Sequence, residues 1–101
     1  MLKHVVYWTL KDEAEGHTAA ENATKFVEII RNLEGRIPSL LSLDVSATFA
    51  DTTTEPCHVI LISTHADAEG LKAYAEHPDH MACIPFIKAI AASRKAIDFI
   101  V

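Results

Sequence analysis

The sequence has few of the residues that metal-binding, disulfide-rich and membrane proteins require. Its two cysteines, Cys57 and Cys83, show no CxxC spacing. A structural zinc site needs more ligands at tighter spacing, and a disulfide framework needs more cysteines. Both thiols are therefore expected to be free, and no metal is predicted. No apolar run approaches the roughly 20 residues that cross a bilayer, which excludes a membrane-spanning helix.

Positive charge is also scarce. Lys and Arg number 9 against 14 Asp and Glu, which gives a net charge of -5. Proteins that bind nucleic acid neutralise phosphates with a stripe of Lys and Arg, and peripheral membrane proteins use a basic amphipathic segment. The sequence has neither, so we expect no nucleic acid and no membrane among its partners. The first residues show no signal-peptide pattern, and the expected location is cytoplasmic.

Hydrophobic residues are plentiful instead. They make up 50% of the 101 residues. A chain of this length is expected to form one domain, residues 1–101. Half is a high hydrophobic share for a small soluble protein, and it indicates that more than one surface is covered.

Hydrophobic spacing predicts the order of the structural elements. The expected elements are a strand at 2–10, a helix from a Thr18/Glu21 capping box to Gly35, strands at 40–49 and 57–64, a helix at 67–76, a helical segment bent at Pro85 and a strand at about 94–100. The connections are expected to be polar loops, with His17 and His65 solvated in two of them. The order β-α-β-β-α-β predicts an α+β, ferredoxin-like fold with an antiparallel four-stranded sheet and helices on one face.

Both faces of this sheet are expected to be apolar. The helix-covered face should carry Leu2, His4, Val6, Trp8 and Leu10 from the first strand and His58, Ile60 and Ile62 from the third. The opposite face should carry Val5, Tyr7, Val59, Leu61, Ile97 and Phe99. Soluble monomers seldom leave such a patch in water, so we predict a homodimer through the helix-free sheet face.

The segment Tyr74-Ala75-Glu76-His77-Pro78-Asp79-His80 is the strongest candidate for a functional motif. Proline suits the first helical position, which places His77 near an N-cap and His80 in the first turn. The positive end of a helix favours a neutral imidazole, which can accept a proton. His80 is therefore a candidate base and Tyr74 a candidate hydroxyl partner. The alternative is a helix junction whose histidines bind backbone carbonyls.

An ordered set of short matches resembles one known family. The matches are Lys3-His4-Val5-Val6, Lys11-Asp12-Glu13, Ile37-Pro38, Ala73-Tyr74 with His77-Pro78-Asp79-His80, Phe86-Ile87-Lys88 and Asp98-Phe99. Together they resemble the stress-responsive dimeric α/β-barrel (Dabb) domain from end to end. The resemblance implies a dimer in which two ferredoxin-like sheets form a barrel.

The family includes olivetolic acid cyclase, which closes a linear polyketide by aldol condensation without any cofactor. The resemblance implies catalytic roles for His80 and Tyr74, and a place for His4 and His58 in the same cavity. The sequence departs from the cyclase in the longer loop before the first helix, at Ile30 and around Cys83. We therefore expect a pocket of different shape and a different substrate.

The expected pocket lies between the sheet and the helices, lined by Val6, Trp8, Phe26, Ile30, Ile60 and Cys83. A base near an acidic carbon and a donor to the enolate oxygen are what an aldol step requires. Each residue also has a structural alternative. His4 can be a strand histidine bonded to a helix or loop carbonyl, His58 can be a strand-start histidine near the surface, and Trp8 can be a core residue. A metal held by His4, His58 and His80 is a minor alternative.

Three functions fit these observations. The first is a cofactor-free cyclase or enolisation enzyme acting on a polyketide-like or β-dicarbonyl substrate, with His80 as the base. The second is a non-catalytic, stress-responsive homodimer that binds a small apolar ligand. The third is a cofactor-independent monooxygenase. One fold hosts many activities, so the fold cannot decide among the three.

Overall fold

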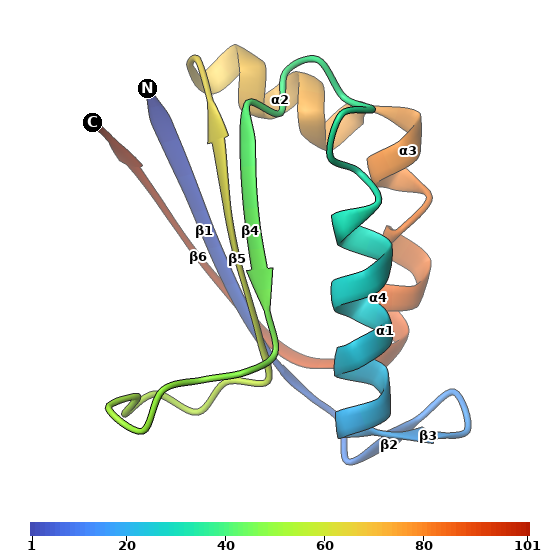
Figure 1. Ribbon diagram of the computed structural model, residues 1–101. Coiled ribbons are helices and arrows are strands. Elements are labelled where there is room, and N and C mark those ends of the chain that lie inside the picture. Colours follow the sequence, from blue (N-terminus) through green and yellow to red (C-terminus); the bar gives the residue numbers. More distant parts are fainter.

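The computed structural model describes all residues, 1–101, as a four-stranded sheet with helices on one side. The elements are β1 (Leu2–Leu10), β2 (Glu13–Ala14), β3 (His17–Thr18), α1 (Ala19–Arg31), β4 (Ser42–Ser46), β5 (Val59–His65), α2 (Ala68–Glu76), α3 (Pro78–Met81), α4 (Ile84–Ile90) and β6 (Ala91–Ile100). The sheet order is β4-β5-β1-β6, and every pair of neighbours is antiparallel. All four helices cover the same face (Figure 1). The predicted ferredoxin-like α+β fold is confirmed.

α1 and α2 begin where the sequence signals predicted, and α2 also ends there. Thr18 and Glu21 exchange both hydrogen bonds of a capping box, and α1 buries one face that includes Phe26 and Ile30. α1 ends at Arg31, four residues before the predicted stop at Gly35, which has a φ of +78° in the turn that follows. Asp67 caps α2 by accepting from the Gly70 N–H. No helix is long and apolar enough to cross a membrane.

A short hairpin replaces part of the polar loop that was predicted after the first strand. In it Glu13 pairs with Thr18 and Ala14 pairs with His17. The two residues between the strands, Glu15 and Gly16, both have positive φ, 52° and 76°. Two consecutive positive φ values are the mark of a type I′ hairpin turn. The sequence suggested a loop because its residues are polar, and two-residue strands are too short to show an alternating pattern.

The assignment of faces on the third strand was wrong. Trp8 pairs with Val59 and Val6 with Leu61, and directly paired residues lie on the same face of a sheet. Val59 and Leu61 are accordingly 0% and 3% exposed beneath the helices, whereas Ile60 lies on the helix-free face together with Ile62. In a strand that is apolar on both faces, the sequence does not show which residues face the helices. An assignment that is wrong by one residue places every side chain on the opposite face.

The helix-free face is apolar in the structure as predicted, with Ile60 and Ile62 in place of Val59 and Leu61. Val5 pairs with Ile97 and Ile62, and Tyr7 pairs with Ile60. Ile97 is 60% exposed and Phe99 is 44% exposed. The ends of the chain lie together beside this face (Figure 1), where the Met1 amino group donates to the Val101 carbonyl.

Candidate functional site

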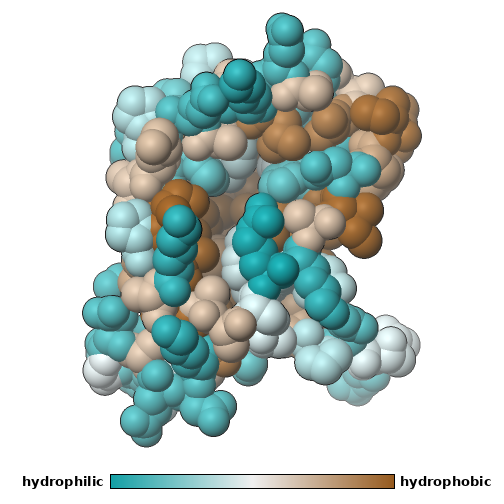
Figure 2. Space-filling view, turned by 180° about the vertical axis from the view of Figure 1, so that it is seen from behind, coloured by the Kyte–Doolittle hydropathy of each residue, from teal (hydrophilic) through white to brown (hydrophobic).

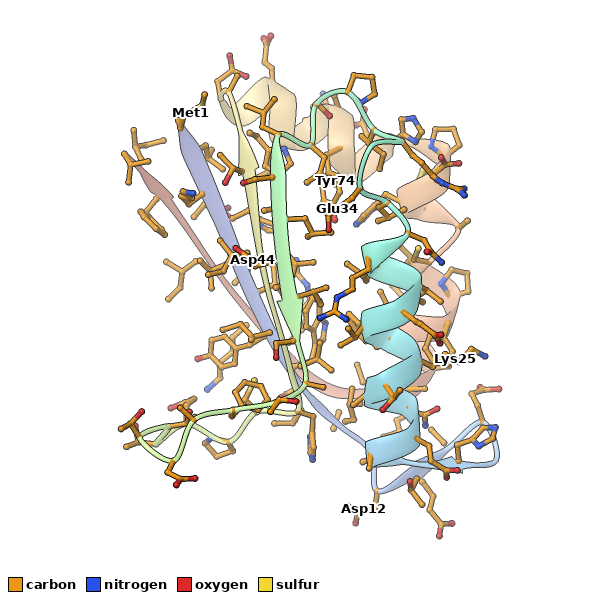
Figure 3. All side chains as sticks on the ribbon, in the orientation of Figure 1. Met1, Asp12, Lys25, Glu34, Asp44 and Tyr74 are labelled. Atoms are coloured by element: carbon orange, nitrogen blue, oxygen red, sulfur yellow. The ribbon has the colours of Figure 1, made fainter.

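A cavity lies between the sheet and the helical layer. It has a volume of about 140 Å³, and seven of its eleven lining residues are hydrophobic. The lining comprises His4, Val6 and Trp8 from β1, Leu61 from β5, Ile30 from α1, Tyr74 from α2, His80 from α3, Ile84, Ile87 and Lys88 from α4, and Arg94 from β6. Tyr74 lies between the sheet and the helices (Figure 3). A mostly apolar pocket with a few converging polar groups is the usual form of a small-molecule site.

His80 is held so that one ring nitrogen can act as a base. Its Nδ1 lies 3.0 Å from the Ala75 carbonyl. A carbonyl only accepts, so Nδ1 carries the proton and Nε2 of the neutral ring keeps a free lone pair. Burial lowers the pKa of His80, and nearby His4 and Arg94 lower it further against the opposing effect of the Ala75 carbonyl. The ring therefore stays neutral under conditions in which an exposed histidine begins to charge.

The helix junction gives His80 this position. His77 caps α3 by accepting the Asp79 N–H on its own Nδ1 at 3.1 Å, and Pro78 fills the first helical position. The junction was predicted, but burial, and not the helix end, is the largest cause of the His80 shift. The bond to the Ala75 carbonyl is the one that the junction interpretation predicts, and it is compatible with a base role for His80, which stays a prediction.

The phenol of Tyr74 stays neutral in this pocket. Its side chain is 2% exposed, and burial raises its pKa to about 12. Its ring centroid lies 4.5 Å from that of His80 and 5.0 Å from that of His65. A neutral phenol can donate a hydrogen bond to oxygen on which negative charge develops.

His4 is oriented by a carboxylate on the neighbouring strand. It pairs directly with Asp98 across β1 and β6, and its Nδ1 hydrogen-bonds the Asp98 carboxylate. The His4 side chain is 13% exposed. A carboxylate at Nδ1 fixes the ring tautomer and leaves Nε2 as the acceptor. Sequence reasoning did not assign Asp98 to the site; the available signal was a carboxylate at an inward position of a strand.

His65 was expected in a solvated loop, and this was wrong. It ends β5 and is 0% exposed. Its Nδ1 donates to the Ser39 carbonyl at 2.7 Å, so its Nε2 accepts from the Ser63 hydroxyl at 2.9 Å. Burial lowers the pKa of His65. The ring packs against that of Tyr74, with 5.0 Å between the two centroids.

Four of the predicted pocket residues do not line the cavity. His58 precedes Val59, the partner of Trp8, so it lies at the far end of β1 from His4; its Nδ1 accepts the Leu10 N–H at 2.8 Å. Its half-buried position just before β5 is close to the strand-start position given as its structural alternative. Phe26 packs behind Trp8, with 4.7 Å between the ring centroids, and Ile60 lies on the helix-free face of the sheet. The Cys83 thiol donates to the Asp79 carbonyl. The remaining predicted residues, His80, Tyr74, His4, Val6, Trp8 and Ile30, all line it.

The two buried histidines should make the fold less stable in mild acid. The pKa of His65 and that of His80 are below the ordinary 6.5, so the unfolded chain binds protons that the folded chain does not. The free energy of unfolding should therefore decrease as the pH falls below about 6.5. Urea midpoints at about pH 7.5 and pH 5.5 measure this change. His17→Gln, at an exposed histidine, should leave the slope unaltered; a midpoint that stays level would contradict the expectation.

The chain belongs to the Dabb family, the stress responsive A/B barrel domain, whose pattern matches residues 2–101. No match was found among curated protein sequences. The family expected from the sequence is thus confirmed over nearly the whole chain.

Similar solved structures share the fold at low sequence identity. A dimeric, ferredoxin-like protein of unknown function from Bacteroides fragilis has a TM-score of 0.84 at 24% identity, over 99% of this chain and 95% of that chain. A putative antibiotic biosynthesis monooxygenase from Nitrosomonas europaea has a TM-score of 0.74 at 18% identity, over 100% and 98%. A hydroxynitrile lyase from Passiflora edulis has a TM-score of 0.77 at 12% identity, over 99% and 92%. These likenesses define the fold and not the reaction.

Proposed function

We propose that this Dabb protein binds a small molecule in the cavity and catalyses a cofactor-free proton transfer on it, of the enolisation or cyclisation type. The observation that carries the proposal is the 3.0 Å contact of His80 Nδ1 with the Ala75 carbonyl at the wall of the cavity, because a proton on Nδ1 leaves Nε2 as a free base. The proposed substrate is polyketide-like or a β-dicarbonyl compound, because such compounds have an acidic carbon between two carbonyl oxygens.

Each polar residue of the cavity then has a role. His80 removes the proton, and the neutral Tyr74 phenol donates to the enolate oxygen that forms. His4, oriented by Asp98, accepts or returns a proton at a second position. The surrounding Val6, Ile30 and Leu61 exclude water, which strengthens these interactions. Of the predicted catalytic residues, His58 is left out because it binds the Leu10 backbone.

The test is hydrogen–deuterium exchange at the acidic carbon of a β-diketone that carries one aromatic ring. In deuterated buffer, the protein should accelerate loss of the proton signal between the two carbonyls, as followed by NMR. The rate should be constant above the lowered pKa of His80 and fall below it, since only the neutral ring accepts a proton. Exchange no faster than with the heat-unfolded protein would overturn the proposal.

A second candidate function is a non-catalytic, stress-related ligand-binding dimer. The hydrogen bond from His80 to the Ala75 carbonyl favours it, since the same bond also stabilises the helix junction. Binding of the diketone without any accelerated exchange would select this function.

We further propose that the protein is a single-domain, cytoplasmic protein.

We also propose that the functional form is a homodimer joined through the helix-free sheet face, since Ile97 and Phe99 are exposed there. Ile97→Glu would bury a carboxylate in that interface and should convert the dimer to a monomer. Sedimentation velocity at micromolar concentration measures the change. Met81→Glu, at a 56% exposed methionine on α3, is the matched control and should remain dimeric. A wild-type monomer would contradict the proposed assembly.

A further inference from the structure

Two cationic side chains line the cavity, and the proposed chemistry uses neither of them. Lys88 comes from α4 and Arg94 from β6, and both line the otherwise largely apolar cavity while remaining exposed. The two elements follow each other directly, since α4 ends at Ile90 and β6 begins at Ala91. Seen from behind, the molecule has a hollow with hydrophilic groups at its edge (Figure 2). The cations therefore belong to the exposed mouth of the cavity.

Neither cation has a partner in the chain. The ion pairs of the structure join His4 to Asp98, His17 to Glu21 and Lys95 to Glu55. The adjacent Lys95, on the other face of β6, is thus paired, whereas Arg94 is not. Acidic residues outnumber basic ones by 14 to 9, so two unpaired cations at one opening do not follow from a basic composition. The nearest inward carboxylate on the same strand, Asp98, is bound to His4.

The volume of the cavity limits what can enter it. About 140 Å³ is close to the roughly 150 Å³ of an engineered apolar cavity that binds benzene. One ring or a short aliphatic chain therefore fits inside, and the rest of a larger ligand lies at the mouth. An apolar interior excludes a charged group, so any charge on the ligand lies beside Lys88 and Arg94.

We propose that the cavity binds an amphipathic carboxylate: a ring or short aliphatic body between the sheet and the helices, and a carboxylate bound at the mouth by Arg94 and Lys88. The planar guanidinium of Arg94 matches the geometry of a carboxylate, and Lys88 adds a second charge. The inference extends the proposed function by giving its substrate an acidic head, as in a β-keto acid, and it depends on that function only in using the same cavity.

The experiment is a binding titration with two probes of equal shape, 3-phenylpropanoate and its neutral amide. The chain has one tryptophan, Trp8, and it lines the cavity, so its fluorescence reports binding. The carboxylate should bind about tenfold more tightly than the amide, because two partly exposed ion pairs contribute a difference in affinity of this size. Salt should reduce the difference. Equal affinities, or no binding of either probe at millimolar concentration, would overturn the inference.

Substitutions at the mouth complete the test. Arg94→Gln and Lys88→Gln should each lower the affinity for the carboxylate severalfold and leave that for the amide unchanged. Lys72→Gln and Arg36→Gln, at exposed cations outside the cavity, are the matched controls and should change neither. Equal loss of both probes would also overturn the inference. The titration measures binding and no turnover. If the protein prefers the carboxylate probe but does not accelerate diketone exchange, the inference stands and the proposed catalysis is refuted.

Discussion

His80→Asn should lower the rate of diketone proton exchange by roughly 10²–10⁴-fold, the usual contribution of a positioned general base. The amide nitrogen of asparagine lies at the position of the histidine Nδ1, so its N–H can donate to the Ala75 carbonyl and preserve the bond now made by Nδ1 at 3.0 Å. Asparagine has no basic nitrogen with which to replace Nε2. The substitution therefore removes the base and retains the helix junction. Exchange followed by NMR gives the rate, and the urea midpoint shows whether the fold is intact.

Two comparisons make this result decisive. His17→Asn changes an exposed histidine that pairs with Glu21, and it should exchange protons at the wild-type rate. Tyr74→Phe removes the phenol donor and should reduce the rate by less than His80→Asn, because a base remains. If His80→Asn retains the wild-type rate while its urea midpoint is unchanged, His80 is not the base.

Phe26→Ala should cost about 3–5 kcal/mol of unfolding free energy. The Phe26 side chain is 0% exposed, and its ring lies 4.7 Å from that of Trp8, centroid to centroid. Its removal leaves a hole behind the indole that forms one wall of the functional cavity. A small domain has a total free energy of unfolding of only about 5–15 kcal/mol, so the variant should be close to unfolding at ambient temperature. Urea unfolding at a fixed protein concentration measures the loss.

Phe86→Ala is the matched control for this substitution. Phe86 is only half-buried, at the edge of the core beneath the Lys25 ammonium. It should cost clearly less than Phe26→Ala because its site can relax toward solvent. Comparable losses at the two positions would contradict the placement of Phe26 at the centre of the core.

Local signals predicted much of the fold. The alternation in the first strand placed His4, Val6 and Trp8 on the helix-covered face, and the capping box set the start of α1. The proline of the HPDH segment fixed the position of His80 in the first turn of α3. Each of these signals depends on residues close in sequence, and for that reason each could be recognised without a structure.

Features that depend on register or on distant partners could not be predicted in this way. The face of β5 is decided by its pairing with β1, and the burial of His65 by the Ser39 carbonyl 26 residues earlier. Asp98 meets His4 only across two strands from opposite ends of the chain. Lys88 and Arg94 are near the cavity because α4 turns directly into β6, which spacing alone does not show. The catalytic roles themselves stay a prediction.

The pairing of the chain ends has a mechanical consequence. β1 and β6 are antiparallel, and Met1 and Val101 hydrogen-bond to each other at one end of the pair. Antiparallel hydrogen bonds run perpendicular to the strands. A force that pulls the two ends apart therefore acts along these bonds and loads them one after another, as in opening a zipper. The edge strand β6, which carries Arg94 and Asp98, would peel away first, so tension on the ends would dismantle the cavity before the rest of the sheet.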